Sequence, residues 1–528
     1  MTLHRRTFLG LPLAAAFAPA PPGGRDPFRR GPLHRGPDFG ALARGLDGRL
    51  VLPGDPAYPE ARQLYQPRYD RTAPAAVAYP AHEGDVAACL GFVRAAGLPV
   101  VARGGGHSYP GWSTGTGLVI DVGALAAVAP GPGTARIGAG ARLADVHAVL
   151  GAQGAVLPTG LCPSVGIAGL TLGGGLGLSS RAYGTTSDNL TGVRLVTADG
   201  RVREAGAERE PELFWALRGG GGGNFGVVTE FRFRTHPAVD CAFAELHWEA
   251  RGTPGLVAGW QRWLAGLPEP FWSQLEFTVG TGARARDRRD PQGGGEGAAG
   301  VPAPAVRVFC AGGRGGLEQE LDRLTALVGG GPRDVYVVTG GQERLTRLMA
   351  GCAELTPDRC HLPGVLPGRD PAGELGRDSY AGRSDFWDAP GLPPVAVDAL
   401  LDALARYPAA VPPGGRGVVQ LDGVCGGALN RVPAGDTAFV HRDRALLTQY
   451  LAYWPEPASP EEAGRHEEWL AGLWSALRPW ASGAAYQNYA DPRLPDWRRA
   501  YYGANLPRLE AARRAYDPDR LFRFPQGL

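Results

Sequence analysis

Two glycine-rich segments, separated by about fifty residues, constrain this chain more than any other feature of its sequence. The first extends from Val101 to Tyr109 and the second from Gly160 to Gly177, and each holds one nucleophilic side chain, His107 or Cys162. Residues without a Cβ atom let the backbone approach a ligand closely. Their exposed N–H groups also form concavities that bind anions such as phosphate. Either segment alone is a weak signal, whereas the two together predict a ligand site.

The two segments resemble the flavin attachment sites of the berberine bridge enzyme-like oxidases. In that family the His of an R-x-G-G-H-S-type loop is bonded to the 8α-methyl group of the flavin, and the Cys of a G-x-C-x-x-V-G-x-x-G loop is bonded to ring carbon 6. Residues 103–109 and 160–169 match both patterns. The resemblance therefore implies FAD that is covalently bound at two sites, through His107 and Cys162.

The resemblance covers most of the chain from Tyr65 onward and is most specific at the two ends. Residues 223–229 match a G-N-F-G-V-V-T motif, and residues 486–526 match the terminal motif of the family in order and spacing. The middle of the chain, residues 251–371, shows the weakest match. Besides the two tethers, the resemblance implies cofactor contacts from Arg103, Gly104, Gly105, Gly106, Ser108, Tyr109, Gly160, Val165, Gly166, Gly169, Gly173, Gly174, Gly226, Val228, Asn488 and Asn505.

One glycine motif resembles a Rossmann-type dinucleotide-binding loop but has the wrong neighbouring elements. Gly221-Gly-Gly-Asn-Phe-Gly226 satisfies G-x-G-x-x-G, but a dinucleotide-binding loop must follow a strand and open a helix. Here a predicted helix, residues 211–217, comes before the motif, and residues 227–233 alternate like a strand after it. We therefore reject a Rossmann-type nucleotide site.

Composition excludes several function classes. The 528 residues are too many for one ordinary core, so two domains are expected. A net charge of +2 gives no electrostatic reason to propose a nucleic acid partner. All 54 basic residues are Arg, and the absence of Lys excludes a Walker A loop and a pyridoxal Schiff base.

The seven cysteines do not show the paired C-x-x-C spacing of a zinc site, and we expect no metal. Cys352 and Cys360 close a short loop. They form a disulfide if the protein is exported, or else they are two buried free thiols; the sequence leaves both alternatives open.

The N-terminus predicts export. Arg5 and Arg6 precede a short apolar, Ala-rich run, which resembles a twin-arginine signal peptide over residues 1–20 and implies the Tat machinery as a partner and a secreted protein. The run is too short to span a bilayer, so no stable membrane anchor is expected. Residues 21–60 are expected to form a linker, with ordered structure from about Tyr65.

The remaining chain predicts an α+β fold. The family resemblance implies a PCMH-type FAD-binding domain in two subdomains over residues 61–238. Its first predicted elements are a helix at 83–96 and a buried strand at 98–103. A substrate domain, an antiparallel sheet covered by helices, is expected over 239–475, with strands near 242–249, 274–280, 305–310 and 418–427 and helices near 256–267, 316–327 and 343–353. A low-complexity loop is expected at 284–303. A C-terminal segment, 476–528, is expected to return to the FAD domain.

Flavin chemistry sets the expected reaction. Oxidising an alcohol carbon requires a base for the hydroxyl proton while a hydride leaves for the flavin. The resemblance implies that Tyr486, with a pKa lowered by positive charge or hydrogen bonds, is this base and that Asn488 positions it or the flavin. Gln420 and Asp422 point to one face of a strand and either line the substrate pocket or are edge polar residues. Arg383 replaces a Lys of the family motif, so that Lys's role is not carried over.

Three functions follow. The first is an FAD-dependent oxidase that acts on a hydroxyl carbon of a sugar, oligosaccharide or glycosylated metabolite and reduces O2 to H2O2. The second is a flavin-dependent dehydrogenase, desaturase or oxidative cyclase of a secondary metabolite. The third is an exported carbohydrate-binding protein on a decayed oxidase scaffold, against which the presence of His107, Cys162 and Tyr486 argues.

Overall fold

The computed structural model describes residues 37–280 and 302–528. The predicted signal segment, residues 21–36 of the predicted linker and residues 284–301 of the low-complexity loop lie outside the described residues. In the part that is described, no helix combines the length and apolar character that crossing a membrane requires.

The first sheet is a small parallel unit. Strands β2 (Ala76–Tyr79), β4 (Leu118–Asp121) and β3 (Val100–Arg103) run parallel, and α3 (Glu83–Ala96) connects β2 to β3. Strands β2 and β4 are buried at every residue, as expected of parallel strands that are covered on both faces. The predicted helix at 83–96 and strand ending at Arg103 are confirmed, and β3 leads directly into the His107 loop.

Ordered structure begins earlier than predicted. Helix α1 (Phe39–Arg44), strand β1 (Arg49–Val51) and helix α2 (Tyr58–Ala61) precede Tyr65, and β1 pairs antiparallel with β2. The expectation of order only from about Tyr65, with a linker to residue 60, is therefore wrong for residues 39–60. These elements are only three to six residues long, so no periodic pattern marks them. Their stability comes from long-range contacts.

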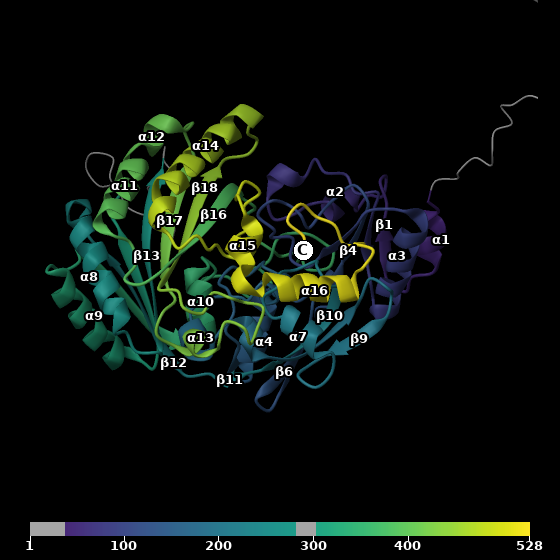
Figure 1. Cartoon of the computed structure of the whole chain (residues 1–528), viewed down its shortest axis with the longest axis horizontal. Coiled ribbons are helices and arrows are strands. Elements are labelled where there is room, and N and C mark those ends of the chain that lie inside the picture. The colour runs from purple at the N-terminus through teal and green to yellow at the C-terminus, as the bar shows by residue number, and fades with distance from the viewer. Residues whose placement is uncertain (1–36, 281–301) are drawn as a thin grey trace, which may run out of the picture. The chain divides into compact units, whose positions relative to one another are not determined.

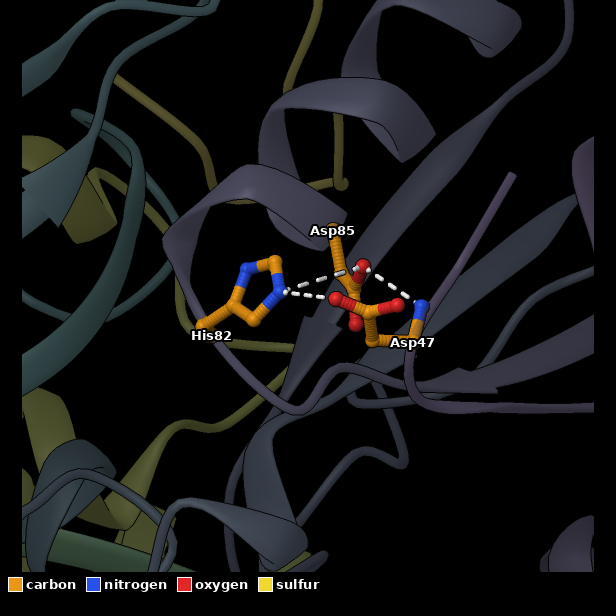
Figure 2. Close-up of side chains that lie close together, drawn as sticks. All are labelled: Asp47, His82 and Asp85. Carbon is orange, nitrogen blue, oxygen red and sulfur yellow. Dashed lines mark hydrogen bonds and ion pairs between the residues drawn. The ribbon is translucent and has the colours of Figure 1, made fainter.

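One such contact is a cluster of Asp47, His82 and Asp85 at the start of α3 (Figure 2). The buried Asp85 carboxylate accepts hydrogen bonds from the backbone N–H groups of Asp47, Gly48 and Ala81, which hold β1 against α3. Burial raises the pKa of Asp85, but these hydrogen bonds outweigh it and the pKa is lowered. His82 Nδ1 accepts from Gly84 N–H, so Nε2 carries the proton donated to Asp47. The cluster is a structural tie, since its groups bind one another and the backbone.

The second sheet is antiparallel. Its order is β5 (Val128–Gly131), β6 (Thr134–Gly138), β10 (Val227–Arg234), β8 (Leu190–Val196) and β9 (Val202–Ala205). Helix α4 (Leu143–Ala152) follows β6. Helix α7 (Pro211–Ala216) occurs where a helix was predicted, and the chain does enter β10 as a strand after residues 221–226. This order of elements agrees with the rejection of a Rossmann-type loop.

The third sheet has seven antiparallel strands, in the order β15 (Asp334–Gly341), β12 (Asp240–His247), β14 (Ala305–Ala311), β13 (Phe271–Gly280), β17 (Arg416–Gly423), β18 (Leu446–Trp454) and β16 (Ser379–Trp387). Helices α8 (Thr253–Ala265), α9 (Arg314–Val328), α11 (Pro394–Ala405) and α14 (Pro460–Leu477) lie beside it (Figure 1). Leu275 and Phe277 join the core that includes Trp260 and Trp263 of α8. Strand alternation therefore turns the residues between them to the opposite face.

The C-terminal segment returns to the part of the chain that carries the two glycine-rich loops, as predicted. Helices α15 (Trp497–Tyr502) and α16 (Leu506–Tyr516) are the yellow helices near the centre of Figure 1. Arg508 donates two hydrogen bonds to Glu212 of the segment that carries α7, and the Leu528 N–H donates to Asn224. The α+β fold class with an antiparallel, helix-covered substrate sheet is thereby confirmed.

A buried arginine joins the helix that precedes β8 to the third sheet. Arg181, on α6 (Ser180–Tyr183), is 2% exposed, and its guanidinium donates to five backbone carbonyls. Three of them, at Leu267, Pro268 and Phe271, lie before or at the start of β13, and those of Cys425 and Gly426 lie after β17. This side chain fixes the position of α6 against the substrate sheet.

Candidate active site

A cavity of about 1100 Å³ lies between the two glycine-rich loops and the open face of the seven-stranded sheet. His107 and Cys162 both line it, although they lie 55 positions apart in the chain. Leu157 to Gly160 deliver the chain to Cys162, and β3 delivers it to His107. The cavity is large enough for a dinucleotide-sized cofactor together with part of a substrate.

The two loops pack on each other through glycine backbone. A Cβ atom on Gly105 would lie 2.1 Å from the backbone nitrogen of Gly166, and one on Gly166 would lie 2.3 Å from the backbone nitrogen of Gly105. Backbone atoms on both sides leave no flexible group that could give way. The glycines at these two positions are therefore required to bring His107 and Cys162 into one cavity.

His107 is held on two sides. Its Nε2 lies 2.9 Å from the hydroxyl of Ser164, and its ring stacks on Tyr65 with centroids 4.0 Å apart. Burial, together with the charge of Arg142, lowers the pKa of His107 to about 3, so the imidazole is neutral at physiological pH. A neutral imidazole is the nucleophilic form that a covalent link requires. The pKa of Cys162 is raised, because the walls of the cavity disfavour its thiolate.

These residues fit a flavin nucleotide. Gly169 lines the cavity at the N-terminal end of α5 (Ile167–Leu172), and a Cβ atom there would meet nothing within 4 Å. Gly222 also lines the cavity and has only distant neighbours, so both backbones are open to a ligand. A glycine-lined wall with two nucleophiles at one end fits FAD.

The structure places most of the predicted cofactor residues on this wall. His107, Cys162 and 13 of the other 16 line the cavity: Arg103, Gly104, Gly105, Gly106, Ser108, Tyr109, Gly160, Val165, Gly166, Gly169, Gly226, Val228 and Asn488. Three do not. A Cβ atom on Gly173 would collide with the Asn488 side chain, and one on Gly174 with the Phe439 ring, while Asn505 donates to the carbonyls of Ala434 and Thr437. Their roles are in packing.

Arg103 contributes its backbone to the cavity wall, whereas its charged side chain binds other parts of the protein. Its guanidinium donates to the carboxylate of Asp121 at 2.5 Å and to the carbonyl of Ala61 at 2.6 Å. The side chain thus holds β3 against β4 and against the end of α2.

Tyr486 lines the cavity, and its hydroxyl is hydrogen-bonded within the protein. Its hydroxyl accepts hydrogen bonds from the Gly175 N–H and from the Asn488 amide, both at 2.9 Å. Burial raises the pKa of Tyr486 to about 12, although these hydrogen bonds act in the opposite direction. The expectation of a lowered pKa is therefore wrong for this structure, whereas Asn488 does position Tyr486.

A second tyrosine, which the sequence analysis did not single out, also lines the cavity. Tyr489 lines it and stacks on Tyr109 with ring centroids 5.4 Å apart. Burial raises the pKa of Tyr489, and the nearby charges of Asp422 and Cys162 raise it further. The Tyr109 hydroxyl accepts a hydrogen bond from Gln449 of β18. Tyr489, Asp422 and the predicted tether Cys162 thus line the same cavity.

The open face of the sheet carries a polar belt, which we define as Gln274, Glu276, Arg307, Gln420 and Asp422. Arg307 donates to Glu276 at 2.7 Å, Gln420 donates to Glu276 at 2.8 Å, and Gln274 donates to Asp422 at 3.0 Å. All five residues line the cavity. Gln420 and Asp422 thus belong to the pocket and are not solvent-facing edge residues.

Asp422 has the most perturbed environment of the belt. Burial raises its pKa to about 7, and Glu276 adds to this, while the hydrogen bond from Gln274 and the charge of Arg307 act against it. A carboxyl group that titrates near neutral pH is suited to general-base catalysis.

Arg383, which replaces the Lys of the family motif, has a structural role. Its Nε lies 3.2 Å from the Asp491 carboxylate, and its guanidinium lies over the Trp474 ring. It does not line the cavity.

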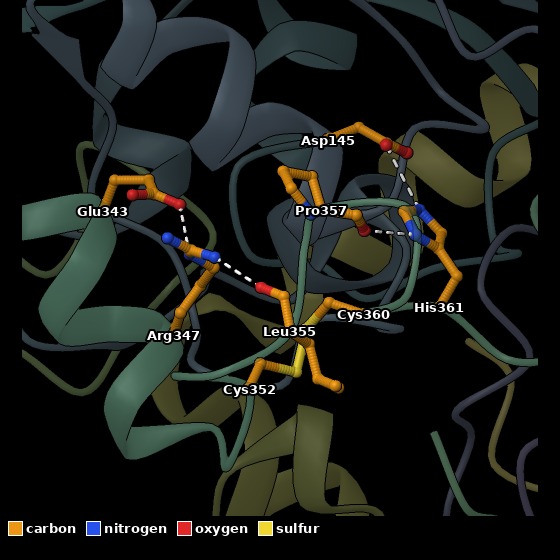
Figure 3. The surroundings of a disulfide bond; sticks show 8 residues. All are labelled: Asp145, Glu343, Arg347, Cys352, Leu355, Pro357, Cys360 and His361. Carbon is orange, nitrogen blue, oxygen red and sulfur yellow. Dashed lines mark hydrogen bonds and ion pairs between the residues drawn. A yellow bond between two sulfur atoms is a disulfide. The ribbon is translucent and has the colours of Figure 1, made fainter. Parts of the chain in front are cut away.

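A long connection between α10 (Gln342–Met349) and β16 supplies part of the cavity lining and contains the disulfide shown in Figure 3. We call residues 350–378 the strap. Cys352 and Cys360 form a disulfide within it, which decides between the two alternatives that the sequence left open. His361 binds Asp145 of α4 at 3.1 Å. Both ends of the strap line the cavity, at Ala350 and Gly351 and at residues 375–378.

Comparison with known proteins agrees with this site. Residues 74–206, which include both tether loops, match the family described as "FAD binding domain", and residues 485–528 match "Berberine and berberine like". An FAD-linked oxidoreductase of Bacillus subtilis, YgaK, described as uncharacterized, is 29% identical over 92% of this chain and 97% of its own length.

Two solved structures extend the comparison. BBE-like 1 of Physcomitrella patens superposes with a TM-score of 0.77 and 27% identity, covering 93% of this chain and 98% of its own. Glucooligosaccharide oxidase of Acremonium strictum, a structure concerned with its 6-S-cysteinyl, 8α-N1-histidyl FAD, superposes with a TM-score of 0.77 and 25% identity, covering 92% and 97%.

Proposed function

Because this chain belongs to the berberine bridge enzyme-like FAD-linked oxidoreductases, we propose that it oxidises a hydroxyl-bearing carbon of a sugar, an oligosaccharide or a glycosylated metabolite and reduces O2 to H2O2. The observation that carries the proposal is the polar belt in the same cavity as His107 and Cys162. Amide, carboxylate and guanidinium groups fixed by one another suit a polyhydroxylated substrate, whose hydroxyls both donate and accept hydrogen bonds.

FAD binding is supported by the family matches, and we further propose two covalent links. His107 and Cys162 would hold the isoalloxazine, and the open backbones of Gly169 and Gly222 would accommodate the nucleotide. FAD, when bound, supplies the hydride acceptor. The residues of the chain then orient the substrate and take the hydroxyl proton.

We assign the proton acceptor to Asp422, which lines the same cavity as Tyr489. The Asp422 carboxyl has its pKa raised to about 7 and lines the cavity, so at neutral pH it can exist as a base without a large cost. Tyr486, the base that the sequence indicated, has its hydroxyl bound to Gly175 and Asn488. We propose that its role is to hold the loop of Gly175 against the C-terminal segment.

The proposal is tested in two steps. Acid-precipitated protein should stay yellow, and its intact mass should include one FAD; His107→Ala or Cys162→Ala alone should each keep the flavin through the other link. Purified protein should then release H2O2 with one or more members of a panel of sugars and glycosides. Colourless protein would refute the cofactor assignment, and flavin reduction without O2 consumption would identify a dehydrogenase instead.

We also propose export by the Tat pathway, to which the N-terminal arginines point. The Cys352–Cys360 disulfide supports an oxidising compartment. Expression with Arg5 and Arg6 both changed to Lys should leave flavin-loaded precursor inside the cell; secretion at the unchanged level would count against this route.

A further inference from the structure

The loop that carries Cys162 also contacts His107, the other proposed tether. Ser164, two residues after Cys162, is 5% exposed, and its hydroxyl lies 2.9 Å from Nε2 of His107. Tyr65 fixes the plane of the imidazole, since the two rings are inclined by only 21°. The two ring nitrogens of an imidazole point in different directions, so a ring whose Nε2 binds Ser164 offers Nδ1 to another neighbour.

The position of the imidazole proton decides which nitrogen can react. A neutral imidazole has one N–H and one lone pair, and the hydrogen bond made by one nitrogen sets the state of the other. The Ser164 hydroxyl oxygen, 2.9 Å from Nε2 of His107, is placed to accept a hydrogen bond from an Nε2–H group.

We propose that Ser164 is a positioning residue for covalent flavin attachment: it keeps the His107 proton on Nε2, so that Nδ1 carries the lone pair that bonds to the 8α carbon. This inference rests on the proposed function, in which His107 is a flavin tether.

Covalent attachment of the flavin to His107 is a two-electron oxidation of the 8α-methyl group. One C–H bond of the 8α-methyl group and the Nε2–H bond of His107 break, and a bond forms between Nδ1 and the 8α carbon. Two protons and two electrons pass to the isoalloxazine and from there to O2, which gives H2O2. The Ser164 hydroxyl lies at Nε2, where the imidazole proton departs.

The experiment uses the Cys162→Ala protein, in which the histidyl link is the only tether. Full-length apoprotein from riboflavin-starved cells is mixed with FAD, stopped in acid at intervals, and assayed for covalent flavin by mass and gel fluorescence. Ser164→Ala should slow attachment about tenfold, the factor that one hydrogen bond of ordinary strength gives. Ser164→Thr, which keeps the hydroxyl, should attach flavin at close to the parent rate.

The linkage isomer gives a second readout. Flavin peptides from the parent should carry the Nδ1 link alone by NMR, and those from Ser164→Ala should contain the Nε2 isomer as well. Ser475→Ala is the matched control, because Ser475 is exposed on α14 and does not line the cavity. It should leave both rate and isomer unchanged.

The outcomes separate the two proposals. Ser164→Ala with Cys162 intact should still form the cysteinyl link, which shows that the variant folds and binds FAD. An unchanged rate and a single Nδ1 isomer in Ser164→Ala would overturn the role of Ser164 and leave the oxidase proposal standing. Absence of covalent flavin in the Cys162→Ala parent would overturn the histidyl tether itself, and the role of Ser164 with it.

Discussion

Asp422 combines a position in the cavity with a pKa of about 7, and this makes its ionisation measurable in the pH dependence of catalysis. A base must be deprotonated, and the pKa is raised from its ordinary value. Activity should therefore be full above pH 7 and fall below it. We expect kcat/KM to drop about tenfold per pH unit on the acidic side.

Asp422→Asn should remove this acidic limb and reduce kcat about 100-fold or more, the usual contribution of a general base. Asp385→Asn is a matched control: burial also raises the pKa of Asp385 to about 7, but Asp385 binds Arg478 and does not line the cavity. That variant should keep the limb. An Asp422→Asn enzyme with the parent pH profile would exclude Asp422 as the base.

The raised pKa also predicts a change in stability. The folded protein binds the Asp422 proton more tightly than the unfolded chain, so this group's contribution is fully present below about pH 4 and is lost as the pH rises through 7. The Asn side chain does not ionise. Asp422→Asn apoprotein should therefore have a higher Tm than the parent at pH 8, and thermal unfolding at pH 4 and pH 8 measures the difference.

Substitutions of the two tyrosines of the C-terminal motif, Tyr486 and Tyr489, should have different effects on turnover and on flavin loading. Tyr489→Phe removes a hydroxyl in the cavity and should lower kcat with little change in bound flavin. Tyr486→Phe removes the acceptor of the Gly175 N–H and Asn488 bonds and should reduce flavin loading or thermal stability first. The opposite pattern, with normal loading and lost turnover in Tyr486→Phe, would restore Tyr486 as the base.

At the scale of elements, the contact between the tether loops depends on glycine. Gly105→Ala or Gly166→Ala should force the loops apart, since each added Cβ would meet backbone at 2.1–2.3 Å. We expect loss of at least one covalent link and of flavin retention after acid treatment. Gly91→Ala in α3 is the control: nothing lies within 4 Å of its Cβ, and helix propensity predicts a gain of up to about 1 kcal/mol.

The strap depends on its disulfide. Replacing Cys352 and Cys360 by Ser should destabilise the strap by about 2 to 3 kcal/mol, the value for closing a loop of this length. Because both ends of the strap line the cavity, KM should rise more than kcat falls. Hydrogen exchange over residues 350–378, compared between variant and parent, measures the local effect; equal protection would contradict it.

The sequence predicted those elements that show a pattern of their own. β13 and β17 alternate, and α3 has helical spacing, so their positions were expected. β18, a central strand buried along almost its whole length, has no alternation, and it was not delineated. α14 was also passed over, although Ser459 and Glu462 form a capping box at its start that could have marked it.

The site residues that the sequence predicted are likewise those that lie in a local pattern. His107 and Cys162 lie in recognisable motifs, whereas Glu276 and Arg307 lie in unremarkable strands. Their place in the polar belt depends on which strands are neighbours and on register, such as Glu276 opposite Gln420. Such long-range pairing is not encoded in any local pattern.

For the whole molecule, Arg181 is the side chain whose loss should matter most outside the cavity chemistry. Arg181→Met would leave five carbonyls without their donor, and each buried unsatisfied group costs about 1–3 kcal/mol. We expect a fall of about 3 kcal/mol or more in the free energy of unfolding, measured with urea. The conservative Arg181→Lys should recover only part of it, because an ammonium has three donors in place of five.

The same guanidinium has a kinetic consequence. A hinge motion between the glycine-rich loops and the seven-stranded sheet would have to break the five hydrogen bonds that Arg181 donates. We therefore expect the width of the cavity entrance to stay the same when a substrate binds. The enzyme should then select ligands by size and hydrogen-bonding pattern rather than by induced fit. In stopped-flow experiments, substrate binding should be a single step whose observed rate constant increases linearly with substrate concentration.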